Sequence, residues 1–172
     1  MRARLACALL VAASLGVLAC AGDNSLGGSV DALFPLSVSF VEIRRNEESF
    51  QVGYYNNRGH DIDLVAQVTV ALYGITLQPG QKVDLAGEYD VGHPRTTVVH
   101  AAADEAPRLM PALRQGDLVL SQGGNPDELT RGDFSVGFLE GSEYGAGRTL
   151  YGNFLGTALD AGFEPPSPDA GP

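Results

Sequence analysis

Cysteine is scarce in this 172-residue chain, and its placement excludes several kinds of chemistry. The two cysteines are Cys7 and Cys20, so the long segment after position 20 contains none. That segment has no disulfide bond, no thiolate metal site and no cysteine nucleophile of its own. Its fold has to be stabilised by burial of apolar side chains and by hydrogen bonding.

Basic residues are also few. The chain has 11 Lys and Arg against 21 Asp and Glu, which gives a formal net charge of −10. A surface of this sign repels phosphate backbones, so we expect no nucleic-acid partner. Solvated carboxylates explain most of the acidic residues, although cation binding by some of them stays open.

Recognisable catalytic motifs are absent from the sequence as well. No Gly-x-Ser-x-Gly nucleophile elbow is present, and no glycine run is placed between a strand and a helix to hold a phosphate. A dispersed Ser/His/Asp triad stays open, because its members meet only in the folded protein. We therefore predict a non-catalytic protein without a cofactor, and keep a hydrolase as an alternative.

The first twenty residues carry the clearest pattern that is present. Arg2 and Arg4 precede an apolar stretch over residues 5–19, which is followed directly by Cys20. A charged start and a short apolar stretch are typical of a secretory signal and are too short for a membrane-spanning helix.

The end of this stretch, Val17-Leu18-Ala19-Cys20, resembles the lipobox of bacterial lipoproteins. The family usually has Leu in place of Val17 and a small residue in place of Leu18. The resemblance implies cleavage before Cys20, a diacylglycerol on its thiol and an acyl chain on its new amino group. It also implies location in the cell envelope, and Ala21 favours the outer membrane under the enterobacterial sorting rule. A plain secretory signal and an uncleaved N-terminal anchor remain as alternatives.

Composition divides the rest of the chain into a tether, one domain and a tail. Cleavage would leave 172 − 19 = 153 residues, enough for a single domain. Glycine and small polar residues follow Cys20, and four prolines fall in the last nine residues. We expect a signal peptide at 1–19, the lipidated cysteine and a flexible tether at 20–33, a folded domain at 34–160, and a disordered tail at 161–172.

Alternating apolar residues predict β-strands through the whole domain. The pattern predicts a hairpin that joins strands at 50–54 and 62–72 across an Asn/Gly-rich turn. Asn125-Pro126 and Glu128 match a helix start and predict one short helical turn near 126–131. Residues 104–116 are expected to form a loop. The other strands are expected at 34–45 with a bulge near 40, and at 83–85, 96–103, 118–120, 134–138 and 148–159.

This pattern predicts an all-β fold, an antiparallel β-sandwich of about seven to eight strands, with a barrel as the alternative. For a partner surface we single out Tyr55, Tyr89 and Tyr144, because tyrosines at exposed positions can stack on sugars or on a protein. Tyr54 is expected to face the core.

Other candidate residues have simpler explanations. His60, His93 and His100 lack the close spacing of a metal site, so we predict no metal. Asp61 and Asp63 share a strand face and could chelate calcium, but polar residues at a strand entrance are the simpler interpretation. The tripeptide at 131–133, Arg-Gly-Asp, is interpreted as the end of the helical turn rather than as an adhesion motif.

The body is similar to small envelope lipoproteins of myxobacteria-like species, a group with no assigned activity, so this resemblance implies location rather than mechanism. We expect a membrane-tethered domain, anchored through Cys20, that binds an envelope protein or a glycan. A structural lipoprotein of a secretion or envelope assembly and an envelope hydrolase are the alternatives. An aromatic-lined groove would favour glycan, an exposed apolar patch would favour assembly, and a convergent Ser/His/Asp pocket would favour catalysis.

Overall fold

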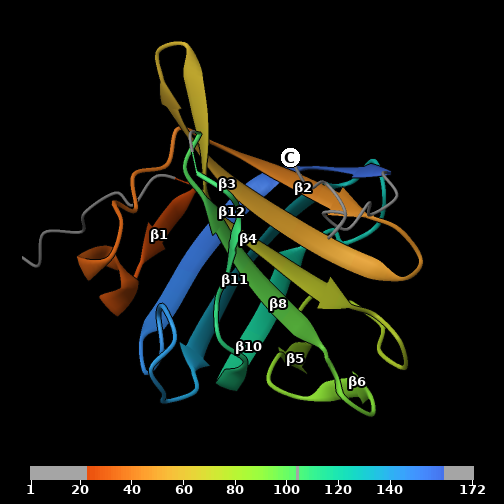
Figure 1. Cartoon of the computed structure of the whole chain (residues 1–172). Helices are drawn as coiled ribbons and strands as arrows, with labels where there is room; N and C mark the ends of the chain where they lie inside the picture. The colour runs from red at the N-terminus through yellow and green to blue at the C-terminus, as the bar shows by residue number, and fades with distance from the viewer. Residues whose placement is uncertain (1–22, 104, 161–172) are drawn as a thin grey trace, which may run out of the picture.

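The computed structural model describes residues 23–103 and 105–160 (Figure 1). The predicted signal peptide, Cys20 and the predicted tail at 161–172 lie outside the described residues. Within the described part, no helix is both long enough and apolar enough to cross a bilayer.

The described residues form β-strands, one short 3₁₀ helix and their connections, which confirms the predicted all-β fold. Strand after strand buries every second residue, as a sheet with one covered face requires. The strands are β1 (Ser25–Gly27), β2 (Phe40–Arg45), β3 (Ser49–Arg58), β4 (Asp61–Ala71), β5 (Lys82–Asp84), β6 (Glu88–Asp90), β7 (His93–Pro94), β8 (Thr96–Ala101), β9 (Arg108–Leu109), β10 (Leu113–Gln122), β11 (Leu129–Phe138) and β12 (Thr149–Asp160).

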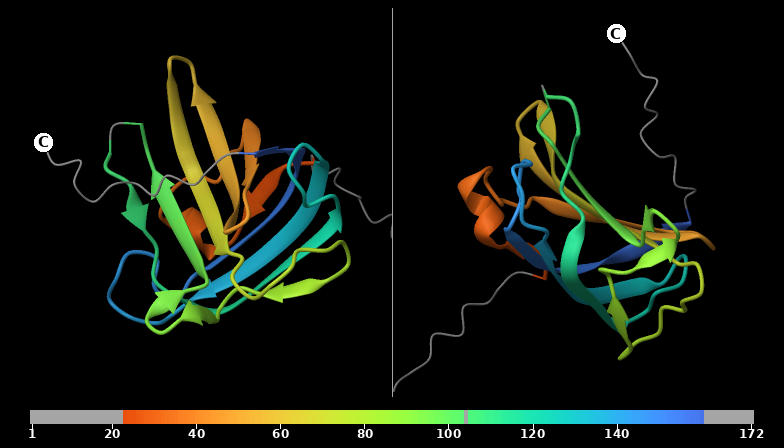
Figure 2. Two further views of the ribbon diagram at one scale, coloured as in Figure 1. Left: turned by 90° about the vertical axis from the view of Figure 1, so that its right-hand side faces the viewer. Right: turned by 60° about the horizontal axis from the view of Figure 1, so that its bottom comes forward.

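Ten of these strands form one continuous sheet in the order β5-β10-β11-β12-β2-β3-β4-β8-β9, and β1 pairs with the free part of the β12 edge. The pairing of β12 with β2 is parallel, whereas the other pairings in the sheet are antiparallel. The predicted antiparallel sandwich is therefore not confirmed, and the sheet is mixed and curled (Figure 2). Strands β6 and β7 form a separate small hairpin.

The curl brings the two halves of the sheet face to face around one core. Phe50 on β3 lies 5.9 Å from Phe154 on β12, measured between ring centroids. Tyr54 lies 6.0 Å from Phe134 on β11 and donates a hydrogen bond of 3.1 Å from its hydroxyl to the carbonyl oxygen of Asn153. The inner faces of the halves are thus in contact, and their outer faces point in opposite directions.

The predicted hairpin over 50–72 is confirmed as β3 and β4, which project beyond the rest of the sheet in Figure 1. Its register shift lies between Tyr54 and Tyr55. The strand predicted from residue 34 begins only at Phe40. Apolar side chains alternate over 34–38 because Phe34 is buried and its apolar neighbours pack against the core, without ladder pairing.

The flexible tether predicted up to residue 33 is wrong for residues 25–32. Strand β1 pairs antiparallel with β12, and the 3₁₀ helix η1 (Ser29–Ala32) follows it. Val30 in η1 is fully buried in the core. Burial of this one apolar side chain stabilises a segment whose other residues are mostly small and polar. The folded domain therefore starts before the predicted boundary at residue 34, and β1 lies beside β12 in Figure 1.

The helical turn predicted near 126–131 is also wrong. Asn125 to Glu128 form a turn between β10 and β11, in which the Glu128 N–H donates to the Asn125 carbonyl at 3.2 Å. The Glu128 carboxylate accepts the Asn125 N–H at 3.2 Å. The residues that match a helix start therefore make their capping contact within a turn. Pairing of β11 with β12 from Leu129 onward leaves no room for a helix. The predicted loop at 104–116 includes β9 and the first residues of β10.

Candidate functional site

The three tyrosines chosen from the sequence lie in three separate aromatic contacts. Tyr55 stacks on Phe40 of β2 with 4.9 Å between ring centroids. Tyr89 on β6 stacks on Tyr73, and Tyr144 stacks on Phe34 at 6.4 Å. The predicted partner surface is therefore not one tyrosine cluster, and each tyrosine has to be considered with its own neighbours.

Tyr54 faces the core and Tyr55 the outside, as expected. Tyr54 is fully buried, and burial, helped by the negative charge of Asp133, raises its pKa well above the usual value. The pKa of Tyr55 is raised by its partial burial and by the nearby Glu42 carboxylate. Tyr54 thus has a structural role, whereas Tyr55 covers Phe40 at the surface.

Tyr89 belongs to a set of three stacked and exposed rings. Its ring lies 5.2 Å from that of Tyr73 and 5.7 Å from that of His93, with interplanar angles of 18° and 27°. Tyr73 follows β4, whereas Tyr89 and His93 lie on the β6–β7 hairpin. These three stacked rings form one wall of a groove of about 480 Å³.

The floor of this groove is the outer face of β4 and β8. Gln67 and Thr69 of β4 lie directly opposite Val99 and Thr97 of β8 in the register, and all four line the groove. Because residues of a strand alternate between its faces, these polar and small side chains point outward while their neighbours fill the core. The exposed Leu109 of β9 lines the groove as well.

Arg95 holds the aromatic wall against the sheet. Its guanidinium donates to the carbonyl oxygens of Ala71 at 3.2 Å and Tyr73 at 3.1 Å, and its backbone pairs with Ala71 and Gly87. The hairpin turn itself uses Gly92 at φ 76°, a conformation that glycine adopts readily. The wall is therefore positioned by backbone contacts, and its three stacked rings remain exposed to solvent.

A carboxylate completes the groove. Glu48 lies beside Tyr73, where its negative charge and its hydrogen bond with the hydroxyl raise the pKa of that tyrosine. The raised pKa keeps the phenol neutral at ordinary pH, and Tyr73 remains 52% exposed, so its ring is accessible. The groove thus combines flat apolar rings with hydroxyl, amide and carboxylate groups.

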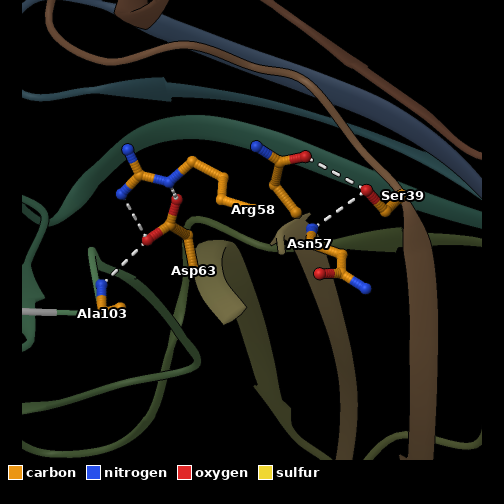
Figure 3. Close-up of polar contacts among 6 residues, drawn as sticks. Ser39, Asn57, Arg58, Asp63 and Ala103 are labelled. Carbon is orange, nitrogen blue, oxygen red and sulfur yellow. Dashed lines mark hydrogen bonds and ion pairs between the residues drawn. The ribbon is translucent and has the colours of Figure 1, made fainter. Parts of the chain in front are cut away.

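A second pocket, also of about 480 Å³, lies beside the projecting β3–β4 hairpin. Asp63 accepts hydrogen bonds of 2.8 Å from both the Arg58 guanidinium and the Ala103 N–H, as Figure 3 shows. The Arg58 hydrogen bond is the largest cause that lowers the pKa of Asp63. Nearby, the Ser39 hydroxyl accepts the Asn57 N–H at 3.0 Å. These contacts join β3, β4 and the segments beside them.

His100 and Tyr144 line the other side of this pocket. The His100 ring stacks on Phe34 at 3.8 Å, and its Nδ1 lies 2.9 Å from the Val65 carbonyl oxygen. A carbonyl only accepts, so Nδ1 carries a proton. The Arg108 guanidinium lies 5.0 Å from the centre of the Tyr144 ring. Most polar groups of this pocket are engaged with other protein groups, which indicates a structural brace.

The histidines and acids considered for metal binding are not assembled. His60 is exposed near the β3–β4 turn, His93 stacks on Tyr89, and His100 stacks on Phe34. The Asp63 carboxylate is engaged with Arg58 rather than paired with Asp61 around a cation. Among residues 23–103 and 105–160, no group of three His, Cys, Asp or Glu residues could hold a metal ion.

The sequence singled out Tyr89 but missed its partners. Tyr73 follows the last strand residues and shows no alternation of its own, and His93 was considered only as a metal ligand. The turn over Val91-Gly92 between short polar runs is a hairpin signal that could have paired Tyr89 with His93. Contact of Tyr73 with this hairpin depends on the fold and has no local signal.

A scan against models of protein families found no matching family, and searches of curated proteins and of solved structures found no match either.

Proposed function

We propose that this protein is a non-catalytic lipoprotein of the cell envelope whose β domain binds a glycan in the groove beside Tyr73, Tyr89 and His93. The observation that carries the proposal is the wall of three stacked rings next to an outward face of Thr and Gln side chains. Pyranose rings have an apolar C–H face that packs on aromatic rings and hydroxyl edges that hydrogen-bond to amides, hydroxyls and carboxylates. The groove offers both kinds of contact side by side.

The negative charge of the protein restricts the kind of glycan that the groove can bind. The chain carries a net charge of −10, and Glu48 adds a carboxylate at the groove itself. Arg95, the basic residue that lines the groove, already donates to two backbone carbonyls. A polyanionic saccharide would meet repulsion without a dedicated cationic partner. The groove therefore suits a neutral glycan such as a hexose or N-acetylhexosamine oligomer.

Membrane attachment through Cys20 is part of the same proposal and is supported by the lipobox pattern. Acylation of Cys20 would place the domain in the cell envelope, where glycans are abundant. Ala21, which follows the cysteine, favours the outer membrane under the enterobacterial sorting rule. A structural role in a secretion or envelope assembly is the second candidate, favoured by the exposed leucines on the outer face of β11 and β12.

Calorimetric titration of a soluble form that begins at residue 21 tests the groove. The probes are cellotetraose and chitotetraose as neutral ligands and a tetragalacturonate as the acidic comparison. We expect heat of binding with a neutral probe and none with the acidic one. Tyr89→Ala should weaken binding about tenfold, since an aromatic contact contributes roughly 0.5–1.5 kcal/mol.

The matched control is Tyr151→Ala, which removes an exposed tyrosine from β12, outside the groove. This variant should bind as the unaltered protein does. Absence of binding to both neutral probes, or equal affinities of the two alanine variants, would contradict the proposed glycan site.

A further inference from the structure

The chain is fixed to the domain from Asp23 onward. The Arg131 guanidinium on β11 pairs with the Asp23 carboxylate at 3.0 Å, and the Asn24 side chain accepts the Leu155 N–H at 2.7 Å. The Ser25 hydroxyl then donates to the Asn153 side chain at 2.9 Å, where β1 pairs with β12. The start of the described chain is thereby attached at one place on the sheet.

This attachment leaves little chain between the domain and a lipid on Cys20. Two residues, Ala21 and Gly22, separate Cys20 from Asp23. The three steps along the chain span at most about 3.3–3.6 Å each, or roughly 10 Å in all. If Cys20 is acylated as proposed above, the surface around Asp23 lies within that distance of the lipid headgroups. A tether of a dozen free residues would allow the domain any orientation relative to the membrane. The short connection between Cys20 and Asp23 restricts that orientation.

The surface beside Asp23 is the outer face of β11 and β12. Arg131 is opposite Leu155 in the register, and Leu129 is opposite Thr157. Leu129 on β11 is 49% exposed, Leu159 on β12 is 44% exposed, and Leu155 on β12 is half-buried. Alternation along both strands places these three leucines on the same side as Arg131. We call this surface, formed by Leu129, Arg131, Leu155 and Leu159, the leucine face.

Two ion pairs lie at the leucine face, and Asp133 adds an exposed carboxylate on the same side of β11. Arg131 pairs with Asp23, and Arg44, which is opposite Leu159 in the register, pairs with Glu42. These pairs add no net charge, so an anionic leaflet repels this side less than a surface of unpaired carboxylates. Exposed leucines gain free energy by entering the boundary between headgroups and acyl chains.

We propose that the leucine face lies against the lipid bilayer in the acylated protein. This inference rests on the proposed acylation of Cys20. Because the outer faces of the two sheet halves point in opposite directions, the groove beside Tyr73 and Tyr89 then opens away from the membrane, towards the surrounding glycans. The short attachment therefore acts as an orienting device as well as an anchor.

Site-directed fluorescence in vesicles tests this orientation. The segment after Cys20 has no other cysteine, so the full chain can carry a single new thiol at Leu129→Cys or Leu159→Cys, and the acylated Cys20 does not react with the dye. Matched controls are Ile62→Cys and Val91→Cys, which are exposed apolar positions on the two projecting hairpins. Each acylated variant is labelled with an environment-sensitive dye and reconstituted into phosphatidylcholine/phosphatidylglycerol vesicles that carry a nitroxide near the headgroup.

We expect dyes at 129 and 159 to lose most of their emission and dyes at 62 and 91 to keep theirs. A second variant with twelve Gly and Ser residues inserted after Gly22 should abolish the difference, because it restores a long tether. Equal quenching at all four positions in protein that floats with vesicles would overturn the inference. Dyes at 129 and 159 that are shielded from a water-soluble quencher in intact envelopes, yet keep their emission in the nitroxide vesicles, would also overturn it, in favour of a protein partner.

Failure of the underlying acylation gives a different result. Protein that does not float with vesicles and whose Cys20 carries no lipid by mass spectrometry would refute the proposed anchor. Floating protein with an acylated Cys20 and no preferential quenching would refute only the orientation. The two proposals are therefore separable in one set of samples.

Discussion

Replacing Val30 by Ala measures whether the N-terminal segment belongs to the fold. Val30 is fully buried, although it lies in a stretch whose composition predicts a flexible tether. The substitution removes two buried carbon atoms, each worth about 0.8 kcal/mol, and leaves a small cavity. We therefore expect the free energy of unfolding to fall by about 2 kcal/mol. An exposed tether would change it by less than about 0.5 kcal/mol.

The matched control is Val91→Ala, which makes the same chemical change at a valine that is 91% exposed on the β6–β7 hairpin. Urea denaturation of both variants is followed by far-ultraviolet circular dichroism, because the chain has no tryptophan to report by fluorescence. With a slope of about 2 kcal/mol per M, the midpoint of Val30→Ala should fall by about 1 M. Equal midpoints for the two variants would refute the docking of residues 25–32.

Three further substitutions test the core, the hairpin brace and a close contact between strands. Tyr54→Phe should lower the free energy of unfolding by about 1 kcal/mol in urea denaturation, because it removes the hydrogen bond to Asn153; no change would mean that this bond does not join the two halves. Asp63→Asn should cost about 1 kcal/mol at pH 7, and the difference should disappear as pH falls below about 4. The folded-state pKa of Asp63 is lowered, so its contribution is present above the unfolded-state pKa and is lost as pH falls through the folded value; a difference that persists at pH 2 would contradict this. Gly132→Ala should cost about 2 kcal/mol, because its new methyl would lie 2.6 Å from the Phe154 ring and 2.7 Å from a backbone oxygen, whereas Gly141→Ala, whose methyl meets nothing closer than 3.9 Å, should unfold as the unaltered protein does.

Local alternation predicts the strands well because each strand buries one face. The β3–β4 hairpin and the run from Phe134 to Phe138 are found where the period-two pattern places them. The same pattern over 34–38 has another cause, since those side chains pack on the core from an irregular segment. Periodicity reports which side chains are buried, and it does not report whether the backbone pairs.

Long-range pairing explains what the sequence could not predict. Docking of β1 depends on β12, more than 120 residues later in the chain, and the parallel pairing of β12 with β2 has no local signature. The turn at 125–128 shows the same limit, because Asn125 and Glu128 satisfy a helix-start pattern and the strand that follows decides the outcome. Of the candidate site, Tyr89 was foreseeable, whereas its stacking on Tyr73 arises from the tertiary fold.

The most direct test of the proposed glycan site is hydrogen–deuterium exchange of the soluble domain with and without chitotetraose or cellotetraose. Binding in the groove predicts slower exchange in residues 67–73, 88–95 and 97–99, which line or support the aromatic wall. Exchange in the pocket beside Arg58 and Asp63 should stay unchanged. Protection confined to that pocket, or no protection with either saccharide at saturating concentration, would contradict the assignment of the groove as the glycan-binding site.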